Sequence, residues 1–181
     1  MPISIDQTLG EQSQAQMNAN PELFRILDAA EYTEAYEKLN QIRDKILQSG
    51  KLVHRNDFPW ELKIIEDDSV LNAFCLPGGY IYIYTGLIKY LNTEDALAGV
   101  LGHEMAHADL RHGTNQMLKN YGLSMIIHFI FGADNSVLLG IGQNLLSLSF
   151  SRADENEADM KSVELLDGTD YDARGVARFF E

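Results

Sequence analysis

The chain has 181 residues and a formal net charge of −13, and its composition is 45% hydrophobic and 23% charged. This length and balance suit a globular protein with a buried core and exclude a mainly disordered chain. The 27 acidic against 14 basic residues exclude nucleic acid and an anionic membrane as direct partners, because a phosphate-binding surface needs an excess of Lys and Arg.

The N-terminal 50 residues are predicted to be mainly helical. Residues 1–50 form N-terminal helices, broken near positions 20 and 31, and Gly50 stands where a helix C-cap is expected. Residues 60–85 change to short β-branched and aromatic runs, with turn residues at Asp67-Asp68 and Pro77-Gly78-Gly79. We expect a small antiparallel sheet there.

The next predicted helix covers residues 93–112. Thr93 is a good N-cap before two acidic residues, and Gly113 is expected to stop the helix. The middle of the segment, ALAGVLG, is apolar on all sides, so the helix should be buried. Helical patterns resume from about Thr114 to Phe131 and over residues 136–166.

The apolar region from Gly122 to Phe150 is interrupted by Gly132-Ala133-Asp134-Asn135. Each half is shorter than the roughly 20 apolar residues that span a bilayer, which favours buried or membrane-apposed helices. The start of the chain lacks a signal-peptide pattern. The end, GVARFFE, is amphipathic without a cap, and we expect the natural chain to continue past Glu181.

The buried helix contains an H-E-x-x-H motif, His103-Glu104-Met105-Ala106-His107. Residues four apart on a helix differ by about 40° in direction, so the two imidazoles can share an ion. Glu104 lies about 100° round, close enough to act on a water molecule beside that ion. Burying these three groups without a strong partner would be costly, so the pattern indicates a zinc hydrolase rather than a hydrogen-bonded structural cluster.

The third ligand is not evident from the motif. His112 is nine residues after His103, about 180° round a continuing helix, so it is expected to face away as a helix-end residue. Downstream, SRADENEAD places Glu155 and Asp159 on one helix face, as a His₂Glu zinc site would require. On pattern alone, an acidic helix start with a Ser151–Asp154 capping box is slightly favoured over a ligand role.

Three separated blocks resemble the M48 family of zinc metallopeptidases, which includes Ste24-, HtpX- and Oma1-type enzymes. They are LNAFCLPGGYIYIYTGLI, LAGVLGHEMAHADLRHG and SRADENEAD, in the family's order and approximate spacing. The resemblance implies a mainly α, α+β zincin-like metalloprotease fold with a buried H-E-x-x-H helix. It also implies a single peptidase domain over residues 1–181.

The resemblance also implies roles for individual residues. The family's third zinc ligand corresponds to Glu155, and the aspartate that hydrogen-bonds a ligating histidine corresponds to Asp159. Asn72 and Ala73 correspond to the edge strand that binds a substrate peptide through its main chain. Glu104 would be the catalytic base. No equivalent of the family's later His or Arg is visible, so the oxyanion stabiliser is unassigned.

The implied function is a zinc endopeptidase with one Zn²⁺ per chain that cleaves unfolded or extended polypeptides, in the manner of a protein quality-control enzyme. The implied location is periplasmic or membrane-associated and extracytoplasmic, with possible peripheral membrane association; the oligomeric state is not indicated. Two alternatives stay open. One is a metal-containing, chaperone-like binding module without turnover. The other is a deformylase-like hydrolase in which the only cysteine, Cys75, supplies a thiolate ligand.

Overall fold

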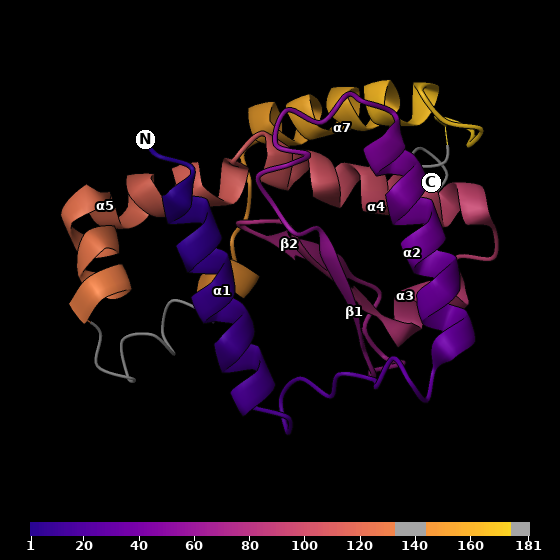
Figure 1. Ribbon diagram of the computed structural model, residues 1–181, viewed down its shortest axis with the longest axis horizontal. Helices are drawn as coiled ribbons and strands as arrows, with labels where there is room; N and C mark the ends of the chain where they lie inside the picture. The colour runs from indigo at the N-terminus through magenta and orange to yellow at the C-terminus, as the bar shows by residue number, and fades with distance from the viewer. Residues whose placement is uncertain (133–143, 175–181) are drawn as a thin grey trace.

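The structure is a computed structural model that describes residues 1–132 and 144–174. It has a mainly helical α+β fold in which helices cover both faces of a small sheet (Figure 1). In chain order the elements are α1 (Ser4–Ala19), α2 (Thr33–Gln48), β1 (Glu61–Ile65), β2 (Ala73–Leu76), β3 (Tyr80–Tyr84), α3 (Thr85–Tyr90), α4 (Glu94–Asp109), α5 (His112–Gly132) and α7 (Arg152–Asp167).

The three-stranded sheet is mixed, so the prediction of a purely antiparallel sheet is wrong. Strands β2 and β3 form the predicted hairpin around Pro77-Gly78-Gly79, but β1 lies on the other side of β3 and runs parallel to it. The reason is topological: residues 66–72 are long enough to carry the chain past the end of β3 before β2 begins. The strand with the most continuous burial, β3, thereby gains partners on both edges.

The alternation of YIYIY along β3 sends its side chains to two hydrophobic clusters. Ile81 and Ile83 contact the cluster that contains α2, α4 and α7, whereas Tyr80 and Tyr82 contact the cluster that contains α1 and α5. Since successive strand residues point to opposite faces, one short strand anchors both layers. The three tyrosines therefore lie on one face of the strand, and Tyr82 stacks on Phe74 of β2.

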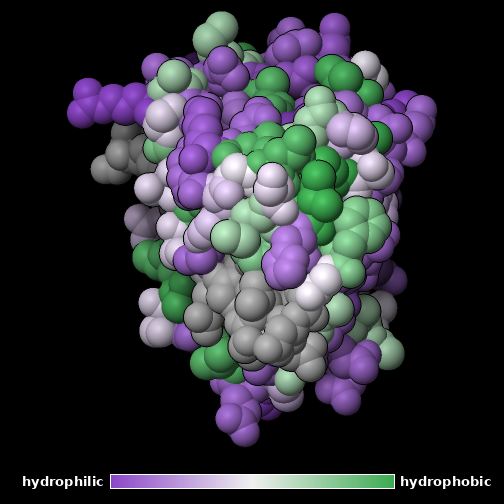
Figure 2. Space-filling view, turned by 90° about the vertical axis from the view of Figure 1, so that its left-hand side faces the viewer, coloured by the Kyte–Doolittle hydropathy of each residue, from purple (hydrophilic) through white to green (hydrophobic). Residues whose placement is uncertain are grey.

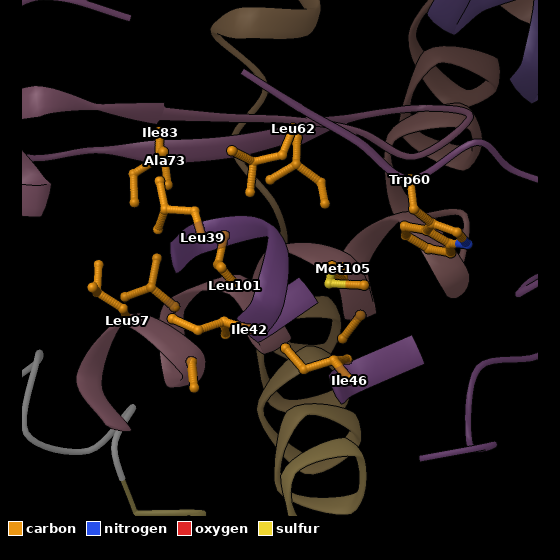
Figure 3. Packing of buried hydrophobic residues seen from close by; sticks show 14 of the residues in the cluster. Leu39, Ile42, Ile46, Trp60, Leu62, Ala73, Ile83, Leu97, Leu101 and Met105 are labelled. Atoms are coloured by element: carbon orange, nitrogen blue, oxygen red, sulfur yellow. The ribbon is translucent and has the colours of Figure 1, made fainter. Parts of the chain in front are cut away.

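The larger cluster fixes α4 beneath the sheet. Side chains of α2, the sheet and α4 point toward one another in Figure 3, where Leu39, Ile42, Ile46, Trp60, Leu62, Ala73, Ile83, Leu97, Leu101 and Met105 are labelled. Every residue of α4 from Ala96 to His103 is buried, as its apolar middle predicts. The helix therefore cannot turn about its axis without exposing apolar surface.

Several predicted helix boundaries agree with the structure and two do not. Thr93 caps α4 by accepting a hydrogen bond from the Ala96 amide. However, α4 ends at Asp109, not near Gly113, because Arg111 adopts a left-handed conformation with φ of 60° that turns the chain into α5. The prediction of one continuous helix over residues 136–166 is also wrong, since Leu148–Ser151 are not helical and Ser151 caps a new helix. Residues 136–143 lie outside the described part.

Helix α5 exposes apolar side chains near its end, at Leu123, Met125, Ile127 and Phe131. Figure 2 views the end of the molecule where α5 lies and shows hydrophobic residues gathered there. Gly122, with φ of 76°, divides α5 into two helical parts. Among the described residues, no helix is long and apolar enough to cross a membrane.

Candidate metal site

Two buried histidines of α4 lie side by side, as their four-residue spacing predicts. The Nε2 atoms of His103 and His107 are 3.1 Å apart, and the two rings are nearly perpendicular. Both side chains are less than a tenth exposed, and the helix residues that precede them from Ala96 to Gly102 are apolar and buried. This arrangement directs two ligand-type nitrogens at one point.

Helix α7 brings a carboxylate to the same point. An Oε2 atom of Glu155 is 3.1 Å from His103 Nε2, and its Oε1 is 3.6 Å from His107 Nε2. The approach depends on small residues between the helices: a Cβ on Gly102 would lie 2.9 Å from the hydroxyl of Ser162, which itself hydrogen-bonds the Gly99 carbonyl. Close contact between α4 and α7 therefore makes the three-residue cluster possible.

The cluster fits a tetrahedral metal ion. Ligand atoms of His103, His107 and Glu155 all lie within 4.8 Å of one another. Zinc bonds of about 2.0–2.1 Å in tetrahedral geometry place neighbouring ligand atoms about 3.3 Å apart, close to the separations found here. The identity of the ion and the role of each ligand remain predictions.

His107 is held in the neutral form that a metal ligand requires. Burial, together with the neighbouring His103 and His112, lowers the pKa of His107 to about 3. The ring of Phe150 stacks on the imidazole of His107 at a centroid distance of 4.3 Å and an interplanar angle of 19°. Phe150 thus restricts ring rotation, a contact that the sequence pattern did not indicate.

Asp159 of α7 approaches the first histidine of the motif. Its Oδ1 is 2.9 Å from Nδ1 of His103, the nitrogen opposite the one that faces the cluster. A carboxylate at that position favours a proton on Nδ1 and leaves Nε2 available for an ion. The Ser151–Asp154 capping box is also present, but it uses the Asp154 carboxylate, so Glu155 is not occupied by the cap.

The prediction that His112 faces away from the motif is wrong. Its Nδ1 is 2.8 Å from Nδ1 of His107, and its Nε2 is 3.1 Å from Oε2 of Glu157. Helical periodicity does not extend to His112, because the left-handed Arg111 ends α4 and redirects the chain. His112 begins α5 and is not among the three grouped ligands.

Glu104 lines a cleft of about 260 Å³ above the cluster. The cleft is lined by the β2 segment and by apolar residues that precede α7, Leu145, Leu146, Leu148 and Phe150. Burial, followed by the nearby Glu155, raises the pKa of Glu104 to about 8, and a backbone hydrogen bond with Cys75 opposes that rise. A carboxyl whose pKa lies near neutral pH can both accept and donate a proton there, so Glu104 is suited to proton transfer.

The β2 strand presents one open edge to the cleft, since among the described strands it pairs only with β3. Asn72 and Ala73 differ in how they lie on it. The Asn72 carbonyl accepts a hydrogen bond from the Tyr84 amide of β3, so its main chain is used within the sheet. Because main-chain groups alternate along an antiparallel pair, those of Ala73 point to the open edge, where the Asn72 side chain accepts from the Ala73 amide.

Cys75 does not join the cluster. Its thiol makes a long contact of 3.6 Å with the Leu76 carbonyl, and it is absent from the residues grouped as ligands. Burial, followed by the charge of Glu104, raises the pKa of the Cys75 thiol well above its usual range. A neutral thiol is a poor ligand, so this geometry gives the deformylase-like alternative no support.

The sequence matches the profile of Peptidase family M48 over residues 35–180. It is 33% identical over 129 residues to the mitochondrial metalloendopeptidase OMA1 of Arabidopsis thaliana, covering 71% of this chain and 26% of that protein. A β-barrel assembly-enhancing protease of Yersinia pestis is 23% identical, covering 99% of this chain and 38% of the relative. The metalloprotease YcaL of Escherichia coli K12 is 27% identical, covering 78% and 61%. The chain thus spans between about a quarter and three fifths of these relatives.

Proposed function

Because the chain belongs to peptidase family M48, we propose that it is a zinc-dependent endopeptidase acting on extended or unfolded polypeptides. The observation that supports this most directly is the convergence of His103, His107 and Glu155 at the floor of a cleft whose wall is an open strand edge. Glu104 lies in the same cleft without being a ligand. Ligands, base and a place for a peptide therefore occur together.

In this proposal each residue of the site has a separate chemical role. Zinc bound by the three ligands would supply Lewis-acid polarisation of a peptide carbonyl and of the attacking water. Glu104 accepts the proton of the water on its carboxylate and delivers it to the leaving amine nitrogen. Asp159 keeps the proton of His103 on Nδ1 through the 2.9 Å contact.

We propose that the substrate lies along β2 as an added strand. The main chain of Ala73 points to the open edge, and the Asn72 side chain that now covers the Ala73 amide would have to give way to a substrate carbonyl. Main-chain pairing needs an extended segment and does not depend on side-chain identity. Unfolded proteins are the substrate class that meets this requirement.

A chaperone-like module that keeps the metal for structure is the alternative. Structural zinc sites are normally closed by four protein ligands, whereas the group found among the described residues has three. Such a module would also have no use for a carboxyl beside the ligands at the base of a cleft. These two features favour turnover over binding alone.

The experiment combines metal content with cleavage of an unfolded protein. We expect about one zinc per chain by mass spectrometry of the metal. We further expect hydrolysis of reduced, unfolded casein that stops on adding a chelator and returns when zinc is restored. A protein that takes up no zinc would remove the proposal, and one that binds zinc and unfolded casein without cutting it would favour the chaperone-like alternative.

The names of the relatives and the surface of α5 also bear on the cellular setting. The names of the relatives place one in mitochondria and connect another with β-barrel assembly, and we propose a protein quality-control role outside the cytoplasm. Peripheral membrane contact through the exposed apolar residues of α5 would fit this setting. Flotation with zwitterionic phosphatidylcholine vesicles tests the contact, since the net charge of −13 disfavours anionic lipid.

A further inference from the structure

The second imidazole of the motif is connected to a carboxylate through another histidine. His107 directs Nε2 at the cluster, while its Nδ1 lies 2.8 Å from Nδ1 of His112. On its other side, His112 places Nε2 3.1 Å from Oε2 of Glu157. His112 is only 4% exposed and belongs to α5, so it links α4 to α7 within the interior.

We propose that His112 and Glu157 are positioning residues that orient His107 and fix its tautomer for metal binding. The inference rests on the proposed metal site and adds two residues that do not themselves bind the ion. It assigns to His107 the kind of support that Asp159 gives His103 directly. Helix α7 would then supply the carboxylate for both ligating histidines.

The two contacts from His107 through His112 to Glu157 are consistent with one arrangement of the ring protons. For Nε2 of His107 to bind an ion, the proton of its neutral ring must be on Nδ1. That N–H then donates to Nδ1 of His112, which must be the acceptor nitrogen of its ring. The proton of His112 is therefore on Nε2, from which it donates to Glu157. Each hydrogen bond has one donor and one acceptor, and no ring needs a second proton.

The turn between α4 and α5 explains why His112 reaches this place. Arg111 adopts a left-handed conformation that L-residues other than glycine rarely use, so its contacts must hold it there. Its guanidinium donates to the buried Asp6 carboxylate and to the carbonyls of Met1 and Pro2. The N-terminal segment thus secures the turn that returns His112 to His107.

The acidic residues of α7 divide between two faces. Glu155 and Asp159 are four residues apart and face the α4 histidines. Asp154 and Glu157 are three apart, and both approach His112 Nε2, at 3.8 and 3.1 Å. This division explains how Glu157 can act on the site although its carboxylate does not reach the cluster.

The test replaces His112 by one residue that lacks an acceptor for the His107 N–H and by one that supplies it. Phenylalanine fills the space without an acceptor, whereas the Oδ1 of asparagine can stand close to the position of the histidine Nδ1. We expect His112→Phe to weaken zinc affinity by about 10- to 100-fold and His112→Asn to retain affinity within a few-fold. Zinc affinity is measured by competition with a chromophoric chelator, and the Co²⁺ absorption spectrum reports ligand geometry independently of activity.

Glu157 provides a second variant that does not disturb the interior, since its side chain is 63% exposed. Glu157→Ala should weaken zinc binding measurably, while Glu164→Ala, at an exposed glutamate farther along the same helix, should not. Equal zinc affinity for the parent, His112→Phe and Glu157→Ala would overturn the inference while leaving the metal site intact. A loss with His112→Asn equal to that with His112→Phe would also overturn it. Failure of the parent to bind zinc would instead remove the proposed function itself.

Discussion

The carboxylate of Asp6 in α1 lies 2.6 Å from the guanidinium of Arg111, although 105 residues separate them in the chain. Asp6 is fully buried and also accepts a hydrogen bond from the Thr114 hydroxyl at 2.6 Å. The N-terminal helix is therefore attached to the junction of α4 and α5 by a charged contact, close to His112. This relationship gives the first prediction.

Asp6→Ala should destabilise the protein by about 3 kcal/mol, because removing one member of a buried ion pair leaves its partner uncompensated. The free energy of unfolding is measured by urea denaturation followed by circular dichroism. The matched control is Asp68→Ala, which removes a similarly short but exposed ion pair with Lys89 and should change stability little. Equal losses for both variants would contradict the structural role given to Asp6.

Gly10→Ala should also be destabilising, against the usual trend. In an ordinary helix this change stabilises by about 0.5–1 kcal/mol. Here an added Cβ would lie 2.0 Å from the Pro77 carbonyl and 2.7 Å from the Tyr80 ring, so α1 would have to move off the β2–β3 hairpin. Overpacking of this kind costs about 1–3 kcal/mol, which should outweigh the usual gain and make the net change in stability unfavourable.

Thermal unfolding of Gly10→Ala and of Asn18→Ala, an exposed position on the same helix, provides the comparison. We expect the melting temperature to fall only in the first. A higher melting temperature for Gly10→Ala would show that the close approach of α1 to the hairpin is wrong.

Glu155→Ala should weaken zinc binding more than Asp159→Ala. The first removes a carboxylate that lies 3.1 Å from Nε2 of His103, a proposed ligand, whereas the second removes only the contact at Nδ1 that we propose orients this ring. The loss for Asp159→Ala should be on the order of 10- to 100-fold in affinity. Titration with zinc, with folding checked by circular dichroism, shows which variant binds zinc more weakly. The reverse order would reject Glu155 as the third ligand.

Glu104→Gln should retain zinc and lose turnover by at least about 100-fold, because an amide cannot accept the proton that a general base removes. The measurement is metal content and casein hydrolysis on the same preparation. Loss of zinc along with activity would mean that Glu104 supports the site rather than transferring protons. Activity within a few-fold of the parent would reject its assignment as the base.

Cys75 should react slowly with Ellman's reagent at pH 8 in the folded protein and rapidly in urea, since burial and the charge of Glu104 raise the pKa of its thiol. Cys75→Ser should change zinc affinity little, because the thiol is not among the grouped ligands. A large loss of zinc in this variant would revive the deformylase-like alternative.

Local features of the sequence determined the parts of the site that lie within one element. The four-residue spacing of His103 and His107 predicted their shared direction, because angles accumulate regularly along a continuous helix. The Thr93 cap and the Pro77-Gly78-Gly79 turn were predictable for the same reason, since each depends on neighbouring residues.

What spans different elements was decided by tertiary packing. Pattern alone slightly favoured a capping box over a ligand role for the start of α7. The close packing of α7 on α4, which leaves no room for a Cβ at Gly102 beside Ser162, brings Glu155 within 3.1 Å of His103. The parallel pairing of β1 with β3 likewise depends on tertiary structure, because β3 is the strand that has partners on both edges. His112 shows most directly where helical periodicity fails to predict the direction of a side chain. The helix ends at Asp109, and the left-handed turn at Arg111 brings His112 back to His107. Asp6, from the other end of the chain, holds that turn through its contact with Arg111.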